Sequence, residues 1–232
     1  MSYLWQEFNI KTFQAETLVF RDGVFCDELS DYENIVYDAD KNIISINKTP
    51  KLPIHIIYVG EINGDIDLNI NVLSENTKVV LTTKIKNKKP AFLNIFIKNT
   101  GKNSLFDGQI IAQNYDNLKI DVNCNHLCEN TGIFVKTRVL AHKNSTTILN
   151  GYANIEKNME NCDSDISFSV MADENAKIQM KPVQYIKSVP NSAKHSASLY
   201  KPNDNQIIYL RNAGLSTSEI QDVFKEAFLS NE

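Results

Sequence analysis

Short runs of alternating apolar and polar residues fill the middle of the chain, from about Pro53 to Pro182. Alternation of this kind buries one face of a segment and is typical of half-buried β-strands. The runs lie at 54–59, 66–72, 79–85, 93–97, 109–112, 118–124, 133–140, 147–155, 166–170 and 178–180. No helical periodicity interrupts them, so the pattern predicts a body built as a β-sandwich, a barrel or a solenoid.

The turns between these runs are polar and carry isolated asparagines. Asn76, Asn99, Asn144 and Asn175 fit tight corners, because asparagine tolerates the left-handed backbone region better than most residues. Corners of this kind favour a solenoid of the β-helix type. Terminal covering elements are expected in repeat folds, and the end of this chain could supply one.

Two helices are predicted near the C-terminus. Asn203 or Asp204 can begin a short helix that Gly214 ends, and Ser216 with Glu219 forms a capping box for a second helix. The apolar residues of the second helix share one face: Ile220, Val223, Phe224, Ala227 and Phe228. The pair either covers the end of the body or forms a docking surface for a partner.

Composition and charge indicate the class of protein and its location in the cell, but not its reaction or ligand. The 232 residues fit one domain, and the net charge of −4 gives no support for a nucleic-acid partner. The opening residues lack the basic and apolar regions of a signal peptide, and no apolar run approaches the roughly 20 residues that cross a bilayer. We therefore expect a cytoplasmic protein without a membrane partner. The 4 cysteines do not suggest a disulfide scaffold.

Cys124, His126 and Cys128 form one candidate metal site. Residues two apart on a strand point the same way, and thiolate and imidazole bind zinc or iron–sulfur clusters. Neighbouring side chains on one face are about 7 Å apart along a strand, too far for three rigid ligands to converge without a bend. The alternative is that Cys124 is a small buried core residue.

A group of acids offers a second reading, because β-helices host polysaccharide-active enzymes. The residues are Asp163, Asp165, Asp173 and Glu174. Such enzymes need two carboxyl groups at a defined separation, whereas acids at turns are commonly solvated. The sequence contains no Walker-type phosphate loop and no nucleophile elbow.

The last third of the chain resembles the SufB/SufD family of iron–sulfur cluster assembly proteins. The matching elements are Asp173-Glu174-Asn175-Ala176, Lys181-Pro182, His195-Ser196-Ala197 and the run from Asp204 to Leu215 that reads DNQIIYLRNAGL. The turn at 126–131 and the stretch at 18–30 match more loosely. No cysteine stands at about Ile186, where the SufB side carries one, so the chain resembles the SufD side.

This resemblance implies a fold and a division of the chain. The fold is mainly β, a right-handed parallel β-helix with a C-terminal helical pair. Residues 1–52 would lead into the core, residues 53–200 would form the β-helix, and residues 201–232 would dock partners.

The resemblance also implies a function, that of a non-catalytic scaffold in a cytoplasmic assembly complex. The chain would pair with a SufB-like scaffold, or with a second copy through the β-helix, and would dock a SufC-type ATPase. No cofactor would be bound stably, but an iron–sulfur cluster would form transiently at a subunit interface, with His195 as the cluster-related residue. The docking candidates are Leu210, Arg211, Ile220, Phe224 and Phe228. A polysaccharide-active enzyme and a homo-oligomeric metal-binding solenoid are the alternative hypotheses.

Overall fold

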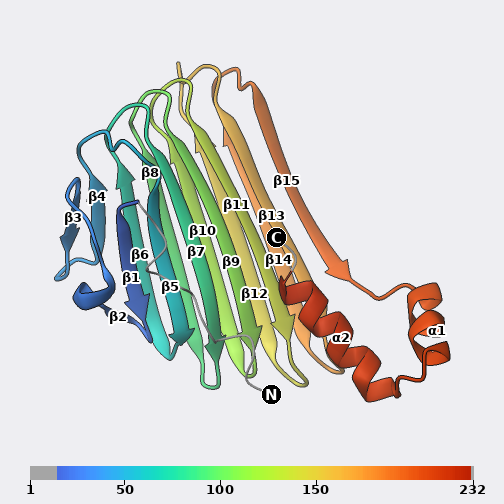
Figure 1. Ribbon diagram of the computed structural model, residues 1–232. Coiled ribbons are helices and arrows are strands. Elements are labelled where there is room, and N and C mark those ends of the chain that lie inside the picture. The colour runs from blue at the N-terminus through green and yellow to red at the C-terminus, as the bar shows by residue number, and fades with distance from the viewer. Residues whose placement is uncertain (1–14, 231–232) are drawn as a thin grey trace.

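A computed structural model describes residues 15–230 of the chain (Figure 1). The strands are β1 (Thr17–Arg21), β2 (Val24–Phe25), β3 (Ile35–Asp38), β4 (Ile43–Ile46), β5 (Ile54–Glu61), β6 (Gly64–Val72), β7 (Lys78–Asn87), β8 (Ala91–Asn99), β9 (Leu105–Asn114), β10 (Asn117–His126), β11 (Gly132–Ala141), β12 (Thr146–Ile155), β13 (Asp163–Ala172), β14 (Lys177–Ile186) and β15 (Ser192–Tyr200). The helices are a short 3-10 turn (Asp27–Leu29), α1 (Asp204–Asn212) and α2 (Thr217–Ser230).

Successive strands alternate between two parallel sheets. Sheet A runs β15-β13-β11-β9-β7-β5-β1-β2, and sheet B runs β14-β12-β10-β8-β6-β4-β3. Each turn of the chain therefore adds one strand to each sheet, which makes the body a parallel β-helix and not a sandwich (Figure 1). The predicted β-helix with two C-terminal helices is confirmed.

The rungs stack in register with a nearly constant length. Lys78 pairs with Leu105 and Gly132 also pairs with Leu105, a step of 27 residues each time (105 − 78 and 132 − 105). Gly132 then pairs with Asp163, a step of 31 (163 − 132). The turn before β13 absorbs the added residues.

Asparagines turn the chain at the corners. Those with positive φ are Asn42, Asn76, Asn103, Asn130, Asn144, Asn158, Asn161 and Asn175. Asn103 donates from Nδ2 to Oδ1 of Asn76, one rung away, at 3.2 Å, so the corners also bond to each other. The prediction for Asn99 is wrong: it is fully buried at the end of β8, where its Nδ2 donates to the Ser104 carbonyl.

Aliphatic side chains fill the space between the sheets. In-register pairing puts like positions on top of each other, as in the inward column Ile70, Ile97, Cys124 and Ala153. All four are almost completely buried. Because a buried aliphatic side chain contributes about 1.5–3 kcal/mol, this stacked interior is the main source of stability.

The two ends of the β-helix differ. At the N-terminal end, β1 pairs antiparallel with β2 and β3 with β4, so the first rungs fold back on themselves. Phe20, Phe25, Tyr37 and Tyr58 pack their rings together there. The start of the predicted 1–52 segment lies outside the described residues, but its β1 and β4 already belong to the two sheets.

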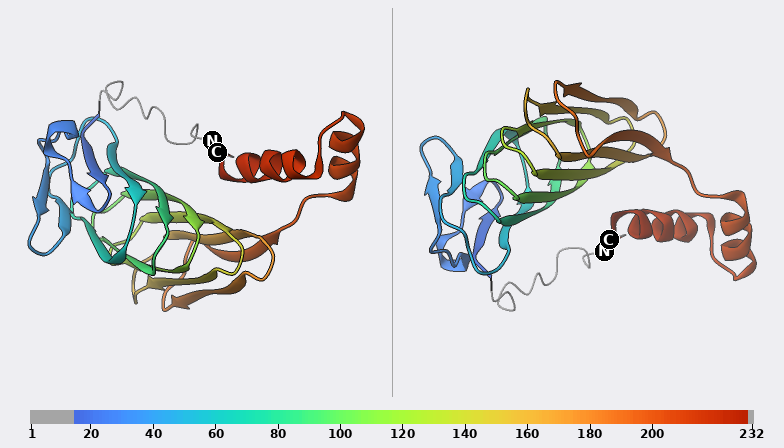
Figure 2. Two further views of the ribbon diagram at one scale, coloured as in Figure 1. Left: turned by 90° about the horizontal axis from the view of Figure 1, so that it is seen from below. Right: turned by 90° about the horizontal axis from the view of Figure 1, so that it is seen from above.

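The C-terminal end is not covered by the helices, contrary to the expectation from repeat folds. α2 packs on the outer face of sheet A, where Ile220, Phe224 and Phe228 are buried against the body. Figure 2 shows α2 lying beside the β-helix, with α1 beyond the last rung. The last rung, β14 with β15, has no further rung stacked on it within residues 15–230.

Gly101 offers a direct test of the stacked corners. A Cβ at this position would lie 2.0 Å from the carbonyl oxygen of Ser74 in the neighbouring rung. We expect Gly101→Ala to lower the free energy of unfolding by about 2 kcal/mol or more in urea denaturation, because backbone must move to make room. Lys102→Ala in the same turn is the control: it removes a partly exposed side chain and its ion pair with Glu129, which should alter stability by less than about 1 kcal/mol. Equal stability of Gly101→Ala and the wild type would contradict this packing.

Candidate functional site

His195 lies in the last rung of the β-helix. It pairs in register with Ile166 of β13, whose side chain is buried in the interior, so His195 occupies an inward-facing column. No rung follows, and His195 is therefore exposed. Ala197 and Leu199 continue the same row, and Leu199 is 54% exposed although its partner Val170 is fully buried.

Sheet B ends in the same way. Met180, Gln184 and Ile186 of β14 continue inward columns of β12, and Ile186 is 43% exposed. Gln184 donates from Nε2 to the carbonyl of Lys194 at 2.6 Å, which ties the two strands of the last rung together. We use the name open end for six inward-facing residues of this rung: Met180, Gln184, Ile186, His195, Ala197 and Leu199. It combines interior-type side chains, one imidazole and two strand edges without partners among the described residues.

The candidate metal ligands do not converge. Cys124 and His126 both point into the interior, whereas Cys128 lies in the turn beyond the end of β10. Cys124 is completely buried in an apolar column, and burial raises the pKa of its thiol, so it behaves as the small core residue of the alternative reading. Across residues 15–230, no three His, Cys, Asp or Glu side chains lie close enough to hold a metal ion.

His126 belongs instead to a buried polar corner with Thr131 and Cys162. Thr131 Oγ1 lies 2.9 Å from His126 Nδ1 and donates to the Cys128 carbonyl at 3.0 Å, so the network favours a proton on Nδ1. Cys162 Sγ lies 3.3 Å from the same hydroxyl. The contact joins residues one rung apart, and no local sequence pattern pointed to Cys162.

The docking candidates on α2 are seated on the body. Ile220, Phe224 and Phe228 are at most 6% exposed, so a partner cannot reach their side chains while α2 stays in place. Leu210 of α1 is half-buried and Arg211 is exposed. The exposed apolar residues of the helical pair are others: Ile208 at 54%, Tyr209 at 72% and Val223 at 40%.

The four acids of the polysaccharide reading are divided between the two ends of β13. Asp163 and Asp165 begin the strand, and Asp173 and Glu174 follow its end. Asp163 binds the Asn191 amide at 2.9 Å, and Glu174 pairs with Lys143 at 2.9 Å. The strand of 10 residues separates the two pairs, a length of roughly 30 Å at the usual rise, so the acids do not form one site.

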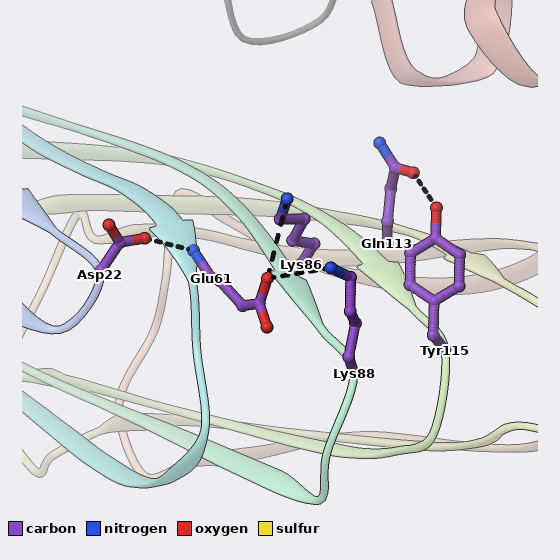
Figure 3. A network of polar contacts seen from close by, with 6 residues as sticks. All are labelled: Asp22, Glu61, Lys86, Lys88, Gln113 and Tyr115. Atoms are coloured by element: carbon purple, nitrogen blue, oxygen red, sulfur yellow. Dashed lines mark hydrogen bonds and ion pairs between the residues drawn. The ribbon is translucent and has the colours of Figure 1, made fainter. Parts of the chain in front are cut away.

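Charged and polar groups line the carboxyl ends of the sheet A strands. Glu61 lies 3.7 Å from Lys86 and 3.4 Å from Lys88, and further along the Tyr115 hydroxyl donates to Gln113 at 3.0 Å (Figure 3). The groups drawn there satisfy each other on an exposed edge, which indicates a structural role.

Three residues connect this edge of sheet A to α2: Tyr115, His142 and Asp173. The Tyr115 ring stacks on His142 with centroids 3.8 Å apart. His142 Nδ1 lies 3.4 Å from Asp173 Oδ2, which also accepts from Lys225 of α2 at 2.8 Å. Burial lowers the pKa of His142, opposed in part by the nearby Asp173 carboxylate.

Because His126 is buried, we expect the stability of the β-helix to fall in acid. Burial lowers its pKa from 6.5 to about 4, so the folded state keeps it neutral while the unfolded chain takes up a proton below about 6.5. Stability therefore falls as the pH drops from about 6.5 to 4, by about 3 kcal/mol in all. His126→Asn, which repeats the Asn99 of the rung before, should flatten this part of the stability curve in urea denaturation at stepped pH. His195→Asn is the control, and an unchanged slope in His126→Asn would refute the assignment.

Comparison with known proteins gives the family. Within residues 15–230, no helix is both long enough and apolar enough to span a membrane. A search of the curated proteins finds no match. The family model described as SUF system FeS cluster assembly, SufBD core domain, matches residues 67–228, from within β6 to the last turn of α2. The chain therefore belongs to the SufB/SufD family of iron–sulfur cluster assembly proteins.

Proposed function

We propose that this chain is a non-catalytic scaffold subunit of a cytoplasmic iron–sulfur cluster assembly complex. It pairs through the open end with a SufB-like chain, or with a second copy, and it docks a SufC-type ATPase through its helical pair. Family membership supports the pathway. The observation that carries the pairing is the open end itself, where side chains of the interior type face solvent.

Within the described part of the chain, the open end has unpaired strand edges to which a strand of another chain can bind. Unpaired strand edges are templates for another chain, and natural proteins normally protect them. β14 contains Pro182, which lacks a backbone donor, whereas β15 has no proline. We therefore assign the pairing to β15. At the other end the edge strands β2 and β3 have only 2 and 4 residues, and short edge strands are poor templates for pairing. A chain of this kind would therefore form pairs through β15 instead of fibres.

His195 would lie inside this interface. Its inward-facing column places the imidazole between the last rung and whatever stacks on it. Imidazole is a ligand for iron, and a cluster assembled there would be the cargo of the complex and not a resident cofactor. Cys124 and Cys162 are buried inside single rungs and cannot reach this surface. The partner would thus have to supply most of the cluster ligands.

The helical pair supplies the second proposed contact. Ile208 and Tyr209 are adjacent on α1 and exposed, and Val223 is exposed on the side of α2 that faces away from the body. Tyrosine is a typical anchor in protein interfaces, so Tyr209 is the expected centre of this contact, with Ile208 and Val223 adding apolar area around it. This surface replaces the buried face of α2 as the first contact with an ATPase.

The alternative functions have less support. The acids of the polysaccharide reading lie at opposite ends of β13 and are engaged in local contacts. Cys124, His126 and Cys128 do not form a common site, which removes the basis of the metal-binding solenoid. Neither reading accounts for the open end.

Leu199→Glu tests the pairing. A carboxylate on the inward face of β15 would be desolvated in the interface, so we expect the Kd for a purified SufB-like chain to rise at least tenfold in sedimentation velocity titrations. Ser196→Glu on the same strand points outward, so it is the matched control and should bind as the wild type does. Equal binding by both variants would show that the open end is not the interface.

Removal of the helices tests the docking. A chain that ends at Pro202 should lose binding to a purified SufC-type ATPase while its thermal unfolding remains cooperative. Ile208→Ala with Tyr209→Ala keeps the helices and should weaken the same binding about tenfold or more. Pull-down and calorimetric titration measure both. Full binding by the shortened chain, with the β-helix folded, would refute docking through the helices.

A further inference from the structure

α2 is held to the body by a contact that is separate from the interior of the β-helix. Its buried residues Ile220, Phe224, Phe228 and Leu229 pack on Ile111, Leu140 and Met171. These seven form their own cluster, apart from the thirty-five buried residues of the interior, because the sheet itself lies between the two. None of the interior residues therefore takes part in the α2 contact.

The body has a dedicated place for α2. Ile111, Leu140 and Met171 stand at outward positions of β9, β11 and β13, and we call them the sheet A strip. Elsewhere the outward positions of these strands are largely polar, as at Gln109, Lys136 and Ser167. A contiguous apolar patch on a protein surface is usually covered by another element, and α2 covers this one.

Few other contacts restrain the helix. Among residues 15–230, Lys225 to Asp173 is the only side-chain polar contact between α2 and the body, at 2.8 Å. His142 and Tyr115 support Asp173 from the body side. α1, which connects α2 to β15, has no fully buried residue. The connection adds only a partly buried apolar contact to the α2 cluster, through Tyr200, Ile207, Leu210 and Leu215.

We propose that α2 is a displaceable arm with two states. In the seated state the Lys225–Asp173 pair holds its apolar face on the sheet A strip. In the released state the β-helix stays folded, and both the apolar face of α2 and the strip are accessible to a partner. This part rests on the proposed function: the ATPase first contacts α1 and then takes up the face that Phe224 and Phe228 present, so the seated contact is autoinhibitory.

Native-state hydrogen exchange on the full-length chain tests the two states. The α2 amides should exchange through a local opening, faster than the amides of β9, β11 and β13. Phe224→Ala should speed α2 exchange on the order of 100-fold or more without changing the strands. Val223→Ala, an exposed change on the same helix, should leave α2 exchange almost unchanged. The proposal is overturned if α2 and the strands exchange together in every variant, or if α2 shows no protection in the wild type.

A locked variant tests the autoinhibition. Asp173→Cys and Lys225→Cys, joined by a bismaleimide, would hold α2 on the body; Cys26→Ser and Cys128→Ser remove the other partly accessible thiols. The locked chain should bind a purified SufC-type ATPase at least tenfold more weakly than the same chain before cross-linking. Equal binding by both forms overturns the autoinhibition while docking stands. Binding by neither form refutes the proposed function, and the exchange data still decide whether the arm opens.

Discussion

In-register stacking of parallel rungs is the constraint on which the whole structure depends. Each strand can bury its inward side chains and satisfy its backbone only if the rung before and the rung after repeat its position. The 27-residue step, the asparagine corners and the aliphatic columns all serve that repetition. The same requirement makes the two ends special, because a terminal rung lacks one of its neighbours.

The N-terminal end of the β-helix has elements that replace the missing neighbour, whereas at the C-terminal end the described residues provide none. The antiparallel pairs β1–β2 and β3–β4, with their aromatic cluster, complete the first rungs. The last rung presents Ile186, Leu199 and His195 at positions whose partners in the rung before, Ile155, Val170 and Ile166, are almost completely buried. Under the proposed function, a partner chain completes the last rung. The seated α2 adds a second contact whose opening does not require the β-helix to open.

Much of the fold could be predicted from the sequence, because alternation is a local signal and the interior of each rung obeys it. The capping box of α2 was equally visible, and Ser216 and Glu219 form it as expected. The alternation pattern does not mark the last strand, β15, which falls within the expected 53–200 β-helix only through the family resemblance. Its inward residues His195 and Ala197 face solvent, so the alternation that marks a buried strand is missing. The sequence also does not predict where α2 packs, because an amphipathic pattern shows that one face is buried but not which surface it covers. The corner of His126, Thr131 and Cys162 depends on rung register, which a single sequence does not display.

Hydrogen exchange of the last rung, measured with and without a purified SufB-like chain, tests the central claim most directly. The account predicts that the β15 amides on the free edge are protected on binding, whereas the amides of β1 to β4 at the closed end are not. Protection at the closed end, or no change in β15 when the complex forms, would contradict it.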